Sequence, residues 1–333
     1  MNKCATIFFI IILTLLPSCF RDNPLEPLPE ISNSELMLVY LETHGNFINS
    51  TNSPSLISPE EVNMNLEKYL LLDIREKVDF TAGHIANAKN IEMKNLFDYI
   101  KSVDTSIIKK IVIISNTGQS SGYAACLLRL YGYQNVYSMN LGMGIWHSDF
   151  VNKLIESSKN ARNIGRFTHQ SFPKLNYVSL PALITGEKTI DKILESRIKL
   201  LLEQGWDNAS IDIDTIMNTY NTDKKTIDYF VICYGSSSLY RMGDYGHPPG
   251  AVLFQPRLDL NSSAYLQTIP NDQKVAVYDS DGQTSAYVVA YLRLLGYDAK
   301  SILGGARSMS GEMCQWRWWT CFKTKQFDYV TGG

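Results

Sequence analysis

The sequence reads IVIISNTGQSSGYAACLLRLYGY at residues 111–133 and VAVYDSDGQTSAYVVAYLRLLGY at residues 275–297. The two segments share a Gly-Gln pair, at Gly118-Gln119 and Gly282-Gln283, and both end in Gly-Tyr. Each begins with an apolar run, continues through a short polar loop and ends with apolar residues at helical spacing. This order predicts a strand, a loop and a helix. A self-similar segment of this length indicates a duplicated domain.

Both segments resemble the active-site loop of the rhodanese family, the sulfurtransferases that carry sulfane sulfur on a cysteine. The resemblance extends upstream of the first copy, through Asp73-Ile74-Arg75 at a strand end and then Gly83-His84-Ile85. Upstream of the second copy the sequence has GHPPGA at residues 246–251, but Cys233-Tyr234-Gly235 stands in place of Asp-x-Arg. Residues 141–146 and 303–306 resemble the closing Gly-Gly turn of the family.

The resemblance implies an α/β fold of two rhodanese-like domains, each a parallel sheet with helices on both faces. Apolar strands that alternate with helical patterns agree with this architecture. We place the domains at residues 56–150 and 207–325, with a connector at 151–206. Within the connector, residues 173–181 are expected to be extended, and a helix is expected to begin near residues 185–187 and to stop at Gly205. Its apolar stripe is Ile190, Ile193, Leu194, Ile198, Leu201 and Leu202.

The residue that directly follows the strand is a catalytic cysteine in the family, but here it is Ser115 in one copy and Asp279 in the other. The loop arginines are also replaced, by Asn116 and Ser120 in the first copy and by Ser280 and Thr284 in the second. A persulfide needs a thiolate, whereas a serine hydroxyl is far less acidic and needs an adjacent base. The nearby histidine, His84, belongs to a Gly-His turn, as does His247.

We therefore expect a binding module without sulfurtransferase activity. Two alternatives stay open: a sulfurtransferase that uses a non-standard cysteine such as Cys233, and a structural scaffold. Each loop is a candidate anion cradle, in which backbone N–H groups at a helix N-terminus face a small oxyanion. The cradle residues are Ser115, Asn116, Thr117, Gly118, Gln119 and Ser120 in the first loop, and Asp279, Ser280, Asp281, Gly282, Gln283 and Thr284 in the second.

The two aspartates of the second loop place negative charge where an anion is expected to sit, so the first loop is the better candidate. Paired aspartates also suit Ca²⁺ or Mg²⁺, but three or more further ligands are needed. We predict no metal site and no cofactor. The net charge of −2 over 333 residues gives no indication of a nucleic-acid partner.

The N-terminus has the parts of a bacterial secretory signal: Lys3, an apolar run over residues 5–16 and then Leu16-Pro17-Ser18-Cys19. The last four residues resemble a lipobox. We expect a signal peptide at residues 1–18, a lipidated Cys19 and a flexible tether at 19–55. The protein is then anchored on the periplasmic side of the envelope, with the outer membrane slightly favoured, and its partner is an envelope protein or a small oxyanion. An uncleaved anchor and a plain signal peptide are the alternatives.

Export to an oxidising compartment changes how the remaining cysteines are interpreted. Cys126 lies in the middle of a predicted helix and is expected to be a buried small hydrophobe. Cys314 and Cys321 flank a tryptophan cluster, and a local disulfide between them is plausible.

Overall fold

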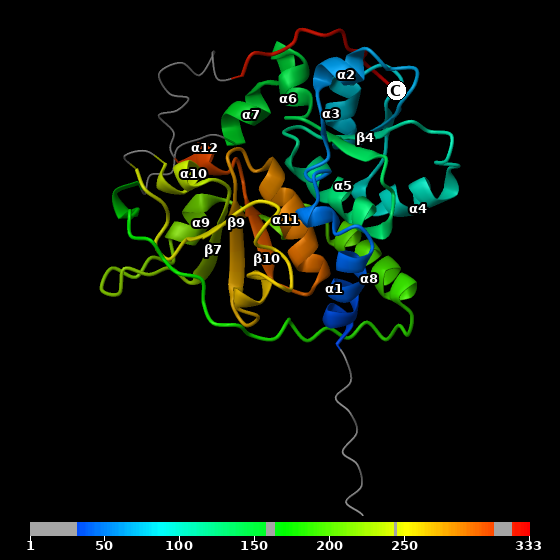
Figure 1. Ribbon diagram of the computed structural model, residues 1–333. Helices are drawn as coiled ribbons and strands as arrows, with labels where there is room; N and C mark the ends of the chain where they lie inside the picture. Colours follow the sequence, from blue (N-terminus) through cyan, green and yellow to red (C-terminus); the bar gives the residue numbers. More distant parts are fainter. Residues whose placement is uncertain (1–31, 158–163, 243–244, 310–321) are drawn as a thin grey trace, which may run out of the picture. The chain divides into compact units, whose positions relative to one another are not determined.

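The computed structural model describes residues 32–157, 164–242, 245–309 and 322–333 (Figure 1). It contains two five-stranded sheets, and every strand pair in both is parallel. The first sheet has the order β1 (Leu56–Ile57), β5 (Val136–Met139), β4 (Ile111–Ile114), β2 (Leu70–Asp73) and β3 (Lys89–Asn90). The second has the order β6 (Ser210–Ile211), β10 (Ala299–Ile302), β9 (Lys274–Tyr278), β7 (Tyr229–Tyr234) and β8 (Val252–Phe254). The matching orders confirm the predicted fold class of two α/β domains.

Helices join the strands and cover both sheets. The first in chain order are α1 (Asn33–Thr43), α2 (Pro59–Asn63), α3 (Lys77–Ala82), α4 (Leu96–Ser102), α5 (Gln119–Tyr131), α6 (Met143–Trp146) and α7 (Asn152–Ser157). The others are α8 (Ile190–Gln204), α9 (Ile213–Met217), α10 (Ser237–Arg241), α11 (Gln283–Leu294) and α12 (Ala306–Met309).

The central strands are apolar on both faces because helices cover both sides of each sheet. In β4, Ile111 and Ile113 face the cluster that contains α5, whereas Val112 and Ile114 face the opposite cluster with Trp146. All four side chains are fully buried. The continuous apolar run at residues 111–114 is therefore the signature of a central strand rather than of a helix.

The helices that follow the two loops, α5 and α11, pack against each other between the sheets (Figure 1). Their close approach depends on Gly122: a Cβ atom there would lie 3.1 Å from the carbonyl oxygen of Gln283 and 3.3 Å from the Tyr287 ring. Both helices belong to one hydrophobic core that the two domains share. The duplicated segments thus form the contact between the domains as well as the loops.

The connector contains the predicted helix as α8, which begins at Ile190 rather than near residues 185–187. It ends at Gln204 before Gly205, a residue with φ of 72°. Five residues of the predicted stripe are buried, and Ile190 packs partly buried against the same core. The helix contacts α1, α4, α5 and α11. It therefore packs against helices of both domains. No helix in the described part of the chain has the length and hydrophobicity needed to cross a bilayer.

The predicted flexible tether at 19–55 is wrong for the described residues from 33 onward. Helix α1 starts at a capping box formed by Ser32 and Glu35. Met37, Leu38 and Leu41 then enter the shared core, as does Phe47 after the helix. Residues 20–55 are polar on average, and this average does not reveal the few apolar residues at helical spacing that form the buried face of α1.

The predicted end of the second domain at residue 325 also needs correction, because the last described segment packs on the first domain. Lys325 and Phe327 donate their N–H groups to Ile145 and Trp146, and Val330 pairs with His84 through two backbone bonds of 2.9 Å. Conversely, the connector, which follows the first domain, packs on the second domain: Thr168 pairs with His247 through two backbone hydrogen bonds of 2.9 Å. The segments that follow each domain are thus exchanged between the domains.

Candidate functional site

The two loops join a central strand to a long helix in the same way in both domains. Ser115 directly follows β4 and Asp279 directly follows β9. Gly118 and Gly282 cap the helices at φ of 83° and 88°, a region that glycine adopts without strain. The closing turns press against the loops: a Cβ at Gly142 would lie 2.1 Å from the Ser115 carbonyl oxygen, and one at Gly305 would lie 2.6 Å from that of Asp279.

In the first loop, the Ser115 hydroxyl lies at the centre of the turn. Its oxygen accepts N–H groups from Gly118 at 3.1 Å and Ser121 at 3.3 Å. It also lies 2.9 Å from the Ser121 hydroxyl oxygen. The Ser115 side chain is buried. The loop therefore directs backbone donors at the atom that follows the strand, as expected of an anion cradle.

In the second loop, a carboxylate occupies the corresponding place. Asp279 accepts the N–H of Gly282 at 2.7 Å and that of Thr284 at 3.2 Å. Asp281 accepts the N–H of Gln283 at 3.1 Å. Burial and then the charge of Asp281 raise the pKa of Asp279 to about 6, although hydrogen bonds from Ser285 and Thr284 oppose the rise. In the second loop, the Asp279 carboxylate thus already accepts N–H groups that an anionic ligand would need.

The two loops differ in whether the N–H groups at the start of the helix are hydrogen-bonded. The equivalent residues are Gln119 and Ser120 in the first loop and Gln283 and Thr284 in the second. In the second loop, those of Gln283 and Thr284 donate to carboxylates. In the first loop, those of Gln119 and Ser120 make no hydrogen bond to any residue that the structure describes. Both lie in the first turn of α5, where the helix dipole favours negative charge. The first loop therefore keeps donors that the second has already used.

An open groove of about 970 Å³ adjoins the first loop. Ser115, Asn116, Thr117 and Ser120 line one side, and the C-terminal end of α8 with Trp206 lines another. Its charges are mixed: Arg75, Lys77 and Lys94 against Glu76, Glu92, Glu203 and Asp207. Arg75 is already paired, since its guanidinium lies 2.7 Å from the buried Asp73 carboxylate. The groove is thus polar without a strong net charge.

A smaller pocket of about 420 Å³ adjoins the second loop and includes Asp279, Ser280 and Thr284. Arg257 also lines it, but its guanidinium donates to the Ser53 carbonyl oxygen at 2.8 Å and 3.0 Å. Arg257 lies outside the duplicated segments, and no pattern in the sequence indicated it.

The two cradle glutamines do not face either opening. Gln119 reaches the second domain, where its side-chain oxygen accepts the N–H of Gly304 at 3.0 Å. Gln283 reaches the first domain, where its oxygen accepts the N–H of Leu141 at 3.0 Å. Both side chains are 1 % exposed. The predicted cradles depend on backbone N–H groups, whereas the glutamine side chains join the two domains; the repetition of Gln in both copies was the available signal for this contact.

Neither of the two described thiols, Cys126 and Cys233, lines the opening beside a loop. Cys126 is fully buried in α5, as predicted, and burial raises the pKa of its thiol. Cys233 is also fully buried, and burial raises its pKa to about 12. Cys19, Cys314 and Cys321 lie outside the described residues. Among the described residues, no group of three or more His, Cys, Asp or Glu side chains is placed to hold a metal ion.

Comparison with known proteins shows which family contains these loops. Residues 58–149 match the rhodanese-like domain. The chain is 32% identical over 95 residues to the thiosulfate sulfurtransferase GlpE of Pseudomonas entomophila, an alignment that covers 28% of this chain and 85% of that protein. It is 31% identical over 93 residues to GlpE of Pseudomonas aeruginosa, covering 28% and 83%.

Among solved structures, a thiosulfate sulfurtransferase from Pseudomonas aeruginosa aligns with 80% of this chain and 47% of its own, at 12% identity and a TM-score of 0.30. The sequence relationship to the GlpE proteins spans most of their length. On that relationship, the chain belongs to the rhodanese-like domain family.

Proposed function

We propose that this protein is an exported rhodanese-like lipoprotein that binds a small oxyanion at the first loop and does not transfer sulfur. The observation that carries the proposal is the pair of unused N–H groups of Gln119 and Ser120 at the start of α5. Helix N-termini with free N–H groups are anion sites because donors and dipole act together. Sulfate, phosphate and thiosulfate all present oxygens that suit such donors.

The residues after β4 and β9 support the proposal that the protein does not transfer sulfur. Ser115 and Asp279 stand where the family resemblance puts a nucleophilic cysteine, and neither forms a persulfide. The alternative thiol, Cys233, is buried with a pKa raised to about 12, so a negligible fraction is thiolate near neutral pH. This weakens the alternative of a sulfurtransferase that uses Cys233.

Exchange of the strand-end residues between the loops tests anion binding. Thiosulfate is titrated into the purified protein by calorimetry. The wild type is expected to bind one anion per chain, and Ser115→Asp to bind none, because the new carboxylate takes the Ser120 N–H, as Asp279 takes that of Thr284, and its negative charge repels a second anion. Asp279→Ser is expected to retain the first site. Unchanged binding by Ser115→Asp, or no binding by the wild type, contradicts the proposal and leaves the scaffold alternative.

Membrane anchorage is a separate part of the proposal and rests on the sequence. Leu16-Pro17-Ser18-Cys19 follows an apolar run, and a diacylglycerol on Cys19 would hold the protein on the periplasmic side of the envelope. Cells are labelled with a fatty-acid analogue. The wild type is expected to take the label and Cys19→Ala is not. Equal labelling of both proteins would show that Cys19 is not the lipidated residue.

A further inference from the structure

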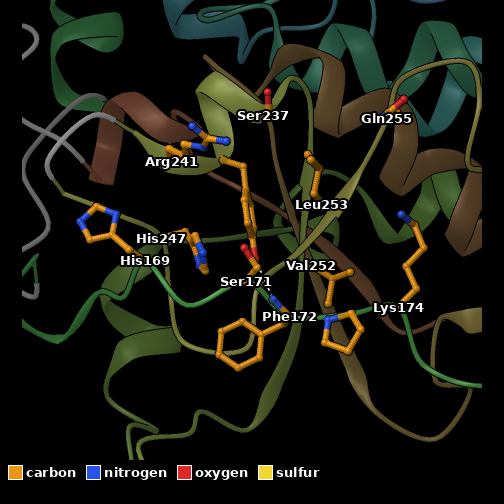
Figure 2. Close-up of a pocket in the computed structure, with 12 residues that line it drawn as sticks. His169, Ser171, Phe172, Lys174, Ser237, Arg241, His247, Val252, Leu253 and Gln255 are labelled. Atoms are coloured by element: carbon orange, nitrogen blue, oxygen red, sulfur yellow. Dashed lines mark hydrogen bonds between the residues drawn. The ribbon is translucent and has the colours of Figure 1, made fainter.

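A cavity of about 420 Å³ lies in the second domain, and no residue of either loop lines it (Figure 2). Connector residue His169 and residues 171–174 form one wall, and residues of α10 and β8 form others. Its volume falls within the range of about 300–1,000 Å³ that is typical of small-molecule sites. The cavity is therefore large enough for a ligand of the size of a substituted ring.

The charged side chains that line this cavity are basic. Among the residues that the structure describes, Lys174 and Arg241 line it together with His169, and no acidic side chain does. Lys174 is already paired, since its ammonium nitrogen lies 3.1 Å from the Asp259 carboxylate. Arg241 is exposed and makes no ion pair with any residue in the described ranges. The guanidinium of Arg241 is thus the cation available to an anionic ligand, at the end of the cavity near His169 (Figure 2).

A buried histidine in the cavity wall has an unused acceptor. His247 is 1 % exposed, and its ring stacks on Tyr240 at 3.9 Å between centroids. Its Nδ1 lies 3.0 Å from the Pro248 carbonyl oxygen, which only accepts, so we assign the proton to Nδ1 and a lone pair to Nε2. Burial lowers the pKa of His247, which keeps the ring neutral near pH 7.

The Nε2 atom of His247 has no hydrogen-bond partner in the described part of the chain. A buried acceptor without a donor carries a free-energy cost, because the atom has lost its hydrogen bond to water. The hydroxyl of the neighbouring Tyr240 does not serve it, because that hydroxyl donates to the Ala251 carbonyl oxygen at 2.6 Å. A ligand that brings an O–H donor to Nε2 removes this cost.

One part of the cavity wall is apolar and contains an aromatic ring. Phe172 lies edge-on to His247, with centroids 6.1 Å apart, and Val252 lies beside it (Figure 2). Flat hydrophobic ligands pack well on such surfaces. We propose that this cavity binds a small organic acid with a flat apolar body and a hydroxyl group. Arg241 binds the acid, Nε2 of His247 accepts the hydroxyl, and Phe172 and Val252 contact the body.

The proposal is independent of the loops and of oxyanion binding there. The first domain supplies a matched control in His84, which also follows a glycine and stacks on an aromatic ring, Phe80, at 3.7 Å. In the first domain, Gly333 packs against these two stacked rings: a Cβ atom placed on Gly333 would lie 3.2 Å from the Phe80 ring and 3.6 Å from the His84 ring. His84 and His247 thus occupy equivalent turns with different surroundings.

Three related compounds test the proposal in the wild-type protein by calorimetry. The probe is 4-hydroxybenzoate, which has the acid, the ring and the hydroxyl; benzoate lacks the hydroxyl and 4-hydroxybenzyl alcohol lacks the acid. We expect 4-hydroxybenzoate to bind one per chain and each of the other two to bind about tenfold more weakly, the effect of losing one hydrogen bond or ion pair. Absence of binding by the probe, or equal binding of all three, overturns the proposal.

Two variants locate the site. Arg241→Gln is expected to weaken 4-hydroxybenzoate about tenfold, whereas Lys188→Gln, at an exposed connector position, leaves it unchanged. His247→Phe keeps the stacked ring and is expected to lower the affinity for the probe to that for benzoate; His84→Phe is the control. If His247→Phe does not fold, Arg241→Gln and the compound series still decide. Full affinity in Arg241→Gln contradicts the proposal.

Discussion

Gln119 and Gln283 each reach across the domain boundary to equivalent places in the other domain. Gln119 accepts the N–H of Gly304 at 3.0 Å, and Gln283 accepts the N–H of Leu141 at 3.0 Å and donates to the Met139 carbonyl oxygen at 3.1 Å. Gly304 and Leu141 begin the turns that close each loop. The bonds therefore couple the loop of one domain to the closing turn of the other.

Loss of either glutamine is expected to destabilise the protein. Gln119→Leu and Gln283→Leu each leave buried backbone groups without partners, so each is expected to lower the free energy of unfolding by roughly 1–3 kcal/mol. Urea denaturation measures the change, and Gln273→Leu, at an exposed position, serves as the control. Equal midpoints for Gln273→Leu and the two buried variants would show that the bonds do not matter for stability.

A cysteine placed in the first loop reports whether the cradle favours an anion. Ser115→Cys puts sulfur where the N–H groups of Gly118 and Ser121 converge, so its thiol pKa is expected below the usual value of about 8.5. Asp279→Cys is expected to show a smaller depression, since Asp281 stays nearby and opposes a second negative charge. The pH dependence of alkylation is followed by mass spectrometry of the peptide that carries the new cysteine. A thiol pKa of about 8.5 or above in Ser115→Cys would show that the first loop does not favour an anion.

The buried carboxyl of Asp279 is expected to make stability depend on pH. Its folded pKa of about 6 exceeds the ordinary value of 3.8, so the folded state binds the proton more tightly than the unfolded state. The contribution is fully present below about pH 4 and is lost as the pH rises through about 6. Over this window, the wild type should lose roughly 2–3 kcal/mol relative to Asp279→Ser.

Urea denaturation at several pH values between 4 and 7 measures this difference. Asp272→Ser removes an exposed carboxylate from the same domain and is the control, expected to run parallel to the wild type. Parallel curves for the wild type and Asp279→Ser would mean that Asp279 titrates alike in both states.

The exchanged C-terminal segment is expected to stabilise the first domain through its backbone. Val330→Pro removes the N–H that donates to the His84 carbonyl oxygen and should lower the free energy of unfolding by about 1 kcal/mol or more. Val330→Ala keeps the N–H and trims a side chain that is 42% exposed, so a change within about 0.5 kcal/mol is expected. Equal effects of the two substitutions would assign the contribution to the side chain.

The sequence predicted those parts of the structure that depend on local pattern. The apolar runs that end before Ser115 and Asp279 gave both central strands, and the stripe from Ile193 to Leu202 gave α8. It did not predict that Asp279 would take the donors of its own loop, since side-chain direction is set by the folded turn. The pairing of Val330 with His84 joins residues 246 positions apart, so no local signal specifies it.

The thiosulfate:cyanide sulfurtransferase assay, run on highly purified wild type and on Cys233→Ser, tests directly whether this protein transfers sulfur. Neither protein is expected to form thiocyanate above the enzyme-free rate, because Ser115 and Asp279 cannot carry sulfur and Cys233 is buried. Thiocyanate formation by the wild type that Cys233→Ser abolishes would instead assign sulfur transfer to Cys233.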